Sequence, residues 1–163
     1  MPVLTESSHA HHARLIPHVD QLVVTAEMVG QVPAAVLMDR LDEDHRFIVG
    51  QLVPHMEAAE AGLYPALERL LQDTRSMKPM RDEHARLRRL IRELGRLHGK
   101  LHAGDFGRGE EFALRRILYR MYAILKVHLA EEEHYLPVLE HNLSDEETAA
   151  LARALEHATT EPL

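Results

Sequence analysis

Apolar residues recur every three or four positions along four long segments of this 163-residue chain. This spacing follows the 3.6-residue repeat of an amphipathic α-helix, whereas the alternating apolar–polar runs typical of strands are almost absent. The predicted helices cover about residues 5–29, 34–71, 80–101 and 110–140. The sequence therefore predicts an all-α protein.

Short connectors separate these segments: "GQVP" (30–33), "DTRSMKP" (73–79) and "HAGDFGRG" (102–109). Helices joined by short turns pack as an up-down-up-down four-helix bundle. The stretch "SDEE" is typical of a capping box and predicts a short C-terminal helix from Ser144 to about Leu155. Pro54 lies inside the second segment, so we expect a kink or a short break just before His55. We expect residues 1–163 to form one domain.

Composition excludes several classes of function. The chain has no cysteine, which rules out disulfides and thiolate chemistry. Its net charge of −7 argues against nucleic acid or an anionic membrane surface as a partner. Neither a long apolar run nor the residue order of a signal peptide occurs, so we expect a soluble, cytoplasmic protein. The 13 histidines are an excess, and they suggest metal binding because imidazole is a common metal ligand.

Four of these histidines, one on each predicted helix, share one height in the predicted bundle. They are His12, His55, His84 and His128. Each lies about 20–23 residues from the tip of its own helical hairpin, which corresponds to a spread of about 4.5 Å. Each also lies on or beside the apolar stripe of its helix. Since imidazoles and carboxylates are costly to bury together without a cation, the pattern predicts a metal site in the core.

Two similar stretches, "HMEAAEAGLYP" and "HLAEEEHYLP", add carboxylates to this site. Glu132 follows His128 by four residues and can reach the same ion from the same helix face. On the second helix Ala59 holds that spacing, and Glu60 lies one residue further on. Glu60 can join His55 only through an over-wound turn, a π-type bulge or a distortion at the nearby proline. We favour Glu60, because Glu60 and Glu132 each precede a proline by five residues.

Together with "HHARL" in the first helix and "EHARLRRLI" in the third, these stretches resemble the hemerythrin-like, or HHE cation-binding, family over about residues 9–140. The resemblance implies a four-helix bundle around two iron ions, a non-haem diiron centre bridged by carboxylates. It also implies the roles of the site residues: the terminal ligands would be His12, His55, His84 and His128, and the bridging carboxylates would be Glu60 and Glu132. The family includes a histidine–carboxylate pair spaced by five residues as well as one spaced by four, in keeping with Glu60.

The chain departs from the oxygen carriers of this family, which have two histidines four residues apart on the third helix. Here Arg88 follows His84 at that spacing. One coordination position is therefore left open, filled by water or filled by a substitute, and the sequence does not choose among the candidates. These candidates are His9, His11, His18, Tyr64 and Tyr135.

The altered ligand set favours binding of or reaction with O2, peroxide or NO, or redox sensing, over reversible oxygen carriage. The alternative is an iron-responsive regulatory or metal-storage module without catalysis. Oxygen and nitrogen donors suit manganese as well as iron, and the sequence does not indicate an oligomeric state.

The remaining histidines give weaker signals. His18 competes with His12 as the ligand from the first helix, because "LIPH" is similar to "LVPH", but height and apolar stripe favour His12. His18 and His45 share a second height, about 12–15 Å nearer the connectors. We expect His98 and His102, which lie near a loop, to face solvent.

Overall fold

The computed structural model describes residues 3–157, and these residues form helices joined by short turns, without a strand among them. In chain order the elements are α1 (Val3–Met28), α2 (Ala34–Phe47), η1 (Ile48–Leu52), α3 (Val53–Ala58), η2 (Ala59–Leu63), α4 (Tyr64–Leu70), α5 (Lys78–His102), α6 (Arg108–Asn142) and α7 (Asp145–His157). The two η segments are π-helical and join α2, α3 and α4 into one continuous rod. The prediction of an all-α protein is confirmed.

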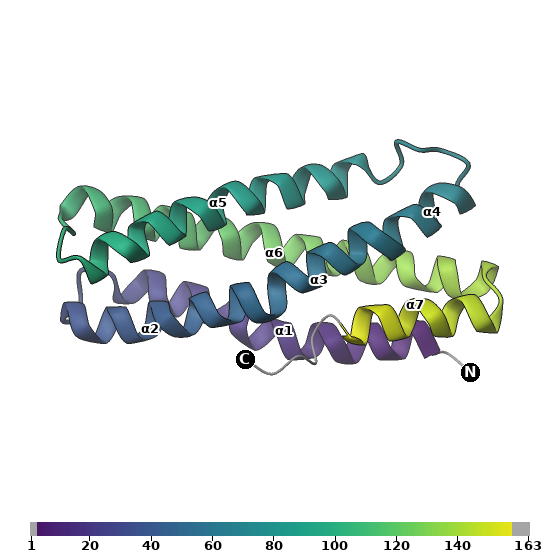
Figure 1. Ribbon diagram of the computed structural model, residues 1–163, viewed down its shortest axis with the longest axis horizontal. Helices are drawn as coiled ribbons and strands as arrows, with labels where there is room; N and C mark the ends of the chain where they lie inside the picture. The colour runs from purple at the N-terminus through teal and green to yellow at the C-terminus, as the bar shows by residue number, and fades with distance from the viewer. Residues whose placement is uncertain (1–2, 158–163) are drawn as a thin grey trace.

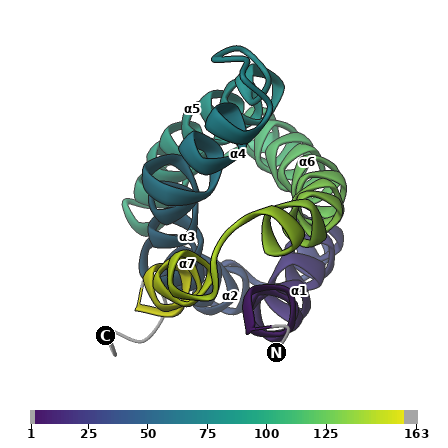
Figure 2. The same ribbon diagram turned by 90° about the vertical axis from the view of Figure 1, so that its right-hand side faces the viewer.

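Four rods lie lengthwise beside one another: α1, the rod from α2 to α4, α5 and α6 (Figures 1 and 2). The turns after α1 and after α5 lie at one end of the molecule, and the connections after α4 and after α6 lie at the other (Figure 1). Within residues 3–157 no helix has the length and apolar character needed to cross a membrane.

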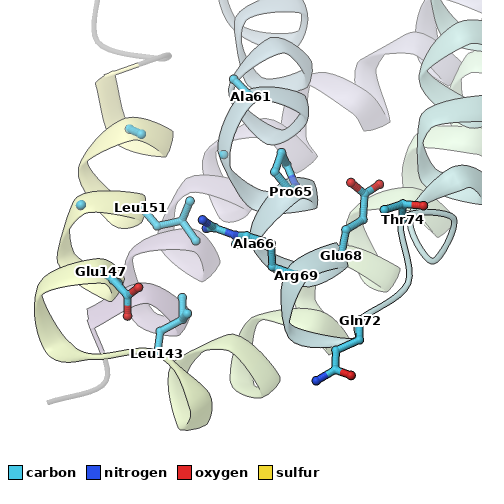
Figure 3. A pocket seen from close by; sticks show the side chains of 13 residues that line it. Ala61, Pro65, Ala66, Glu68, Arg69, Gln72, Thr74, Leu143, Glu147 and Leu151 are labelled. Atoms are coloured by element: carbon cyan, nitrogen blue, oxygen red, sulfur yellow. The ribbon is translucent and has the colours of Figure 1, made fainter.

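The short C-terminal helix α7 folds back beside α1 at the end where α6 finishes (Figure 1). Its start is a reciprocal capping box, as predicted: the Ser144 backbone N–H donates to Glu147 Oε2 over 2.9 Å, and the Glu147 N–H donates to Ser144 Oγ over 3.2 Å. An open groove separates α7 from α4 (Figure 3). Apolar side chains line it together with the polar residues Glu68, Arg69, Gln72, Thr74 and Glu147. None of the lining residues is a predicted metal ligand.

Each π-helical segment ends two residues before a proline of the same rod. The segment η1 precedes Pro54, and η2 precedes Pro65. Proline lacks a backbone N–H, and its ring clashes with the carbonyl four residues earlier, whereas a π turn bonds to the fifth residue back. The wider turns therefore carry the helix past both prolines, and η1 stands where a kink or break was predicted before His55.

The segment η2 also absorbs the length difference between the two similar stretches. "HMEAAEAGLYP" has one residue more than "HLAEEEHYLP", and a π bulge accommodates one additional residue in a helix. The additional residue turns the following side chains by about 100° relative to a regular helix. Tyr64 is fully buried, whereas Glu60 is only half-buried.

The apolar core consists of two clusters with a polar layer between them. The larger cluster contains Leu22, Leu94 and Leu118 and extends toward the end where α1 and α5 finish. The smaller cluster contains Leu67 and Leu139 from the rods and is completed by the apolar face of α7. Because both clusters exclude water, the polar side chains between them must form hydrogen bonds with one another.

Asp44 is a buried carboxyl group beside the larger cluster, and it makes stability depend on pH. Thr25 Oγ1 donates to its Oδ2 over 2.6 Å, but burial raises the pKa of Asp44 to about 6. Between about pH 4 and pH 6 the folded state therefore binds the proton more tightly than the unfolded state, and stability falls as pH rises through this window.

Replacing this residue, Asp44→Asn, should remove the charge that must be buried at neutral pH. We expect the variant to be more stable than the wild type by roughly 1–2 kcal/mol at pH 8, with little difference near pH 4. Urea unfolding at both pH values measures this, with the exposed Asp39→Asn as control. An equal effect at both pH values would contradict the assignment.

Candidate metal centre

Five buried side chains from all four rods meet between the two apolar clusters. They are His12 of α1, His55 of α3, His84 of α5, and His128 and Glu132 of α6, and each exposes 2% or less of its surface. They form two groups that share Glu132, and in each group one donor atom per residue lies within 4.8 Å of the others. One group adds His12 and His55, and the other adds His84 and His128.

The two oxygens of Glu132 face different pairs of imidazoles. Oε2 lies 3.2 Å from His12 Nε2 and 3.0 Å from His55 Nε2. Oε1 lies 3.2 Å from His128 Nε2, whose own neighbour is His84 Nε2 at 2.9 Å. A carboxylate placed in this way can hold one ion on each oxygen.

The outer nitrogen of each imidazole also has a partner. His12 Nδ1 lies 3.3 Å from Glu133, His84 Nδ1 lies 2.8 Å from Glu60, His128 Nδ1 lies 2.7 Å from Glu83, and His55 Nδ1 lies 2.9 Å from His11 Nε2. Three of these partners are carboxylates, which only accept hydrogen bonds. The corresponding Nδ1 atoms therefore carry a proton, and Nε2 is the nitrogen of each imidazole that would bind a metal ion.

This arrangement brings metal-ligating atoms together and fits a bound cation. The inner nitrogens of His84 and His128 lie 2.9 Å apart, His128 Nε2 lies 3.2 Å from Glu132 Oε1, and the Tyr64 hydroxyl donates to this oxygen over 2.8 Å. Burial and the adjacent His128 lower the pKa of His84 to about 4, so its imidazole is neutral at pH 7. Although burial acts in the opposite sense, Glu132 and Glu83 raise the pKa of His128, so a proton on this imidazole offsets part of the charge of Glu132. A bound cation would replace that proton and lie among the same nitrogen and oxygen atoms.

Glu132 is ionised although it is buried. Burial alone would raise the pKa of its carboxyl group, but the imidazoles of His55, His12 and His128 outweigh burial and lower that pKa well below the ordinary value. One buried carboxylate and four imidazoles form a nitrogen-rich, sulfur-free donor set that suits iron, manganese or zinc rather than calcium.

A profile of the hemerythrin HHE cation-binding domain matches residues 3–112, about two thirds of the chain. The chain belongs to this family. Searches of curated proteins and of solved structures give no significant match. The matched part contains the histidines of the first three rods but ends before His128 and Glu132. The donors from α6 are therefore identified by their position in the structure.

Membership of the HHE family supports cation binding, and the structure brings five of the six predicted ligands together. Glu60, the sixth, lies on the far side of His84, where its Oε1 accepts from Nδ1. The Arg88 guanidinium donates to both Glu60 oxygens over 2.8 Å. Although burial acts in the opposite sense, Arg88 and His84 lower the pKa of Glu60. Glu60 thus fixes the orientation of His84 in this structure and lies outside both groups.

Tyr64 was one of five candidates to replace the histidine that HHE proteins of the oxygen-carrier type have on the third helix. Its hydroxyl oxygen lies 3.1 Å from His84 Nε2 and 3.3 Å from His128 Nε2, beside Glu132. Burial, reinforced by the negative charge of Glu132, raises the pKa of the phenol above its ordinary value. No sequence signal singled out Tyr64, because the π turn of η2 decides where it points.

The other candidates lie further out. His11 contacts the outer nitrogen of His55, and burial together with His55 lowers the pKa of His11 to about 3. His9 is exposed beside Glu133. Tyr135 is half-buried against the smaller apolar cluster.

His18, the competitor of His12, is exposed and stacks on Phe47 with ring centres 4.9 Å apart. His45, which was expected at the same height, instead has its ring 5.2 Å from that of His98. The structure therefore gives no His18–His45 pair among its ring contacts, and His12 is the histidine of α1 that faces Glu132.

Proposed function

We propose that this HHE protein holds two non-haem iron ions, one on each oxygen of Glu132, and binds or reacts with O2, peroxide or NO. The observation that supports the proposal is the division of the four imidazoles into two pairs by one buried carboxylate. A single ion would need only one of these pairs.

In this proposal His12, His55 and Glu132 would hold the first ion, and His84, His128 and Glu132 would hold the second. The outer partners Glu133, Glu60, Glu83 and His11 keep the imidazoles in the tautomer and orientation that metal binding requires. Two ferrous ions would supply two electrons to a small oxidant. Glu60, predicted as a bridge, acts here as an orienting partner of His84, and this role is also part of the proposal.

The surroundings favour small ligands. The polar layer is covered on both sides by buried apolar clusters, and the groove between α4 and α7 is lined by none of the proposed ligands. A diatomic molecule or peroxide fits such a dry interior better than a large organic substrate, because large ligands need a preformed cavity of several hundred Å³.

Tyr64 completes the second ion's oxygen ligands in this proposal. We expect the ferric protein to absorb visible light through charge transfer from the phenolate to iron, and we expect Tyr64→Phe to lose this band while keeping its iron. Absorption spectra and metal analysis of both proteins measure these properties. The matched control is Tyr135→Phe, which changes a half-buried tyrosine outside the site. If Tyr64→Phe kept the band, Tyr64 would not be a ligand.

Reactivity is tested by mixing the anaerobically prepared ferrous protein with limiting O2, hydrogen peroxide or NO. We expect at least one of them to be consumed or bound in proportion to the iron present, with a change in absorption. An iron-loaded protein that leaves all three unchanged would refute this reactivity and support the alternative of a regulatory or storage module without catalysis.

A further inference from the structure

A second group of metal-ligating side chains lies on the surface, far from Glu132. His98 and His102 are four residues apart on the last two turns of α5 and project from one helix face. Asp42 of α2 lies opposite them. His98 follows His84 by fourteen positions, which places this group about 21 Å along α5 from the core.

The three side chains point their donor atoms at one position. Asp42 Oδ1 lies 2.5 Å from His98 Nε2 and 2.9 Å from His102 Nε2. The two Nε2 atoms are 3.2 Å apart. Ligands on a tetrahedral zinc ion, with bonds of about 2.0–2.1 Å, are separated by about 3.3 Å, so the two imidazoles already have nearly the spacing that such an ion requires. The Asp42 carboxylate, 2.5 Å and 2.9 Å from them, would move outward by less than about 1 Å.

A hydrogen-bonded trio without metal explains these contacts less well. Both imidazoles turn the same nitrogen toward the same carboxylate oxygen and toward each other. If both nitrogens carry protons, both can donate to Oδ1, but the two N–H groups then lie side by side with their nitrogens only 3.2 Å apart. If one does not, a lone pair faces a neighbouring acceptor. An ion between the three atoms removes both conflicts.

The site is open to solvent on one side and has a further imidazole beside it. His102 is exposed and His98 is half-buried, so an ion can enter without passing through the core. His45, three residues after Asp42, has its ring centre 5.2 Å from that of His98 and is exposed. A change of its side-chain rotamer, or a water molecule, would supply the fourth ligand.

We propose that Asp42, His98 and His102 form a second metal site, which binds Zn²⁺ or a chemically similar divalent transition-metal ion and links α2 to α5. Two imidazoles and one carboxylate without sulfur suit zinc and nickel better than the hard cations calcium and magnesium. This site does not depend on the proposed iron centre, because the two share no residue.

The test measures Zn²⁺ binding by calorimetric titration in two backgrounds: the iron-loaded wild type and Glu132→Gln, in which the core donor set is broken. We expect one zinc ion per chain to bind in both backgrounds. The double variant His98→Asn/His102→Asn should bind that ion at least tenfold more weakly. The matched control, His134→Asn/His141→Asn, changes two exposed histidines of α6 that contact only backbone carbonyls. The control should bind zinc as the wild type does.

Unchanged zinc affinity in the His98/His102 double variant would overturn the proposal, and so would an equal loss in the control. Asp42→Asn provides an independent variant on the other helix, and its affinity should also fall at least tenfold. If the double variant lost helix content by circular dichroism, the Asp42→Asn result would decide. Because binding is measured in the Glu132→Gln background as well, the outcome does not depend on whether the core holds iron.

Discussion

Replacing Glu132 with glutamine should remove both iron ions from the core. Glu132 is the only residue shared by the two groups, and each of its oxygens faces one pair of imidazoles. The amide has one oxygen instead of two equivalent ones, carries no charge, and turns N–H donors toward the inner nitrogens. We expect the iron content of Glu132→Gln after loading and dialysis to fall at least tenfold, since even outer-shell changes lower metal affinity by about 10–100-fold.

The matched control for this variant is Glu131→Gln. Glu131 is the preceding residue of α6 and is exposed, so the substitution makes the same chemical change outside the site. The control should keep the iron content of the wild type. A Glu132→Gln protein that still held two irons per chain would show that another group bridges the ions, and the proposed ligand set would be wrong.

Removing iron with a chelator should lower the melting temperature substantially. Without a cation the inner nitrogens of His84 and His128 lie 2.9 Å apart beside Glu132. A metal that binds only the folded state raises the free energy of unfolding by about 4 kcal/mol when its free concentration exceeds the dissociation constant a thousandfold. For a chain of this size 1 kcal/mol corresponds to about 2–4 °C. We therefore expect the melting temperature to fall by about 10 °C, measured by circular dichroism.

The same treatment of Glu132→Gln serves as the control for this second prediction. Its melting temperature should not respond to chelator, because no core metal is left to remove. The wild type could instead melt at the same temperature with and without chelator. The side chains of the polar layer would then satisfy one another's hydrogen bonds without metal, and the proposed stabilisation by a bound cation would be wrong.

The helices and the meeting of the histidines could be predicted from the sequence. The spacing of apolar residues shows which face of each helix points into the core. The constant rise of about 1.5 Å per residue gives the height of each residue when residues are counted from the hairpin tips. This reasoning placed His12, His55, His84 and His128 at one level, where the structure also has them, with Glu132 between them. Their role as iron ligands stays a prediction.

The position of Tyr64 could not be predicted, because it depends on where the rod takes up an additional residue. A π turn anywhere between His55 and Pro65 would satisfy the sequence, and each choice turns a different side chain inward. In the structure the turn is η2, which leaves Glu60 beside Arg88 and buries Tyr64. An arginine that pairs with a carboxylate competes with a metal ion for it. In the sequence, Arg88 was recognised only as the residue in place of a second histidine, and its pairing with Glu60 was not predicted.

The surface group was missed for a different reason. His98 and His102 were expected in solvent because they lie near a loop, although their four-residue spacing is a metal-binding signal on any helix. Their partner Asp42 comes from α2, and the approach of α2 to α5 at this height becomes visible only in the folded chain.

In the proposed centre one buried carboxylate divides four imidazoles into two metal sites. The most direct test is the number of iron ions per chain in the wild-type protein, measured by mass spectrometry of the metal after anaerobic loading and removal of loosely bound ions. We expect about two irons per chain. One iron, or none, would show that Glu132 does not divide the imidazoles into two metal sites.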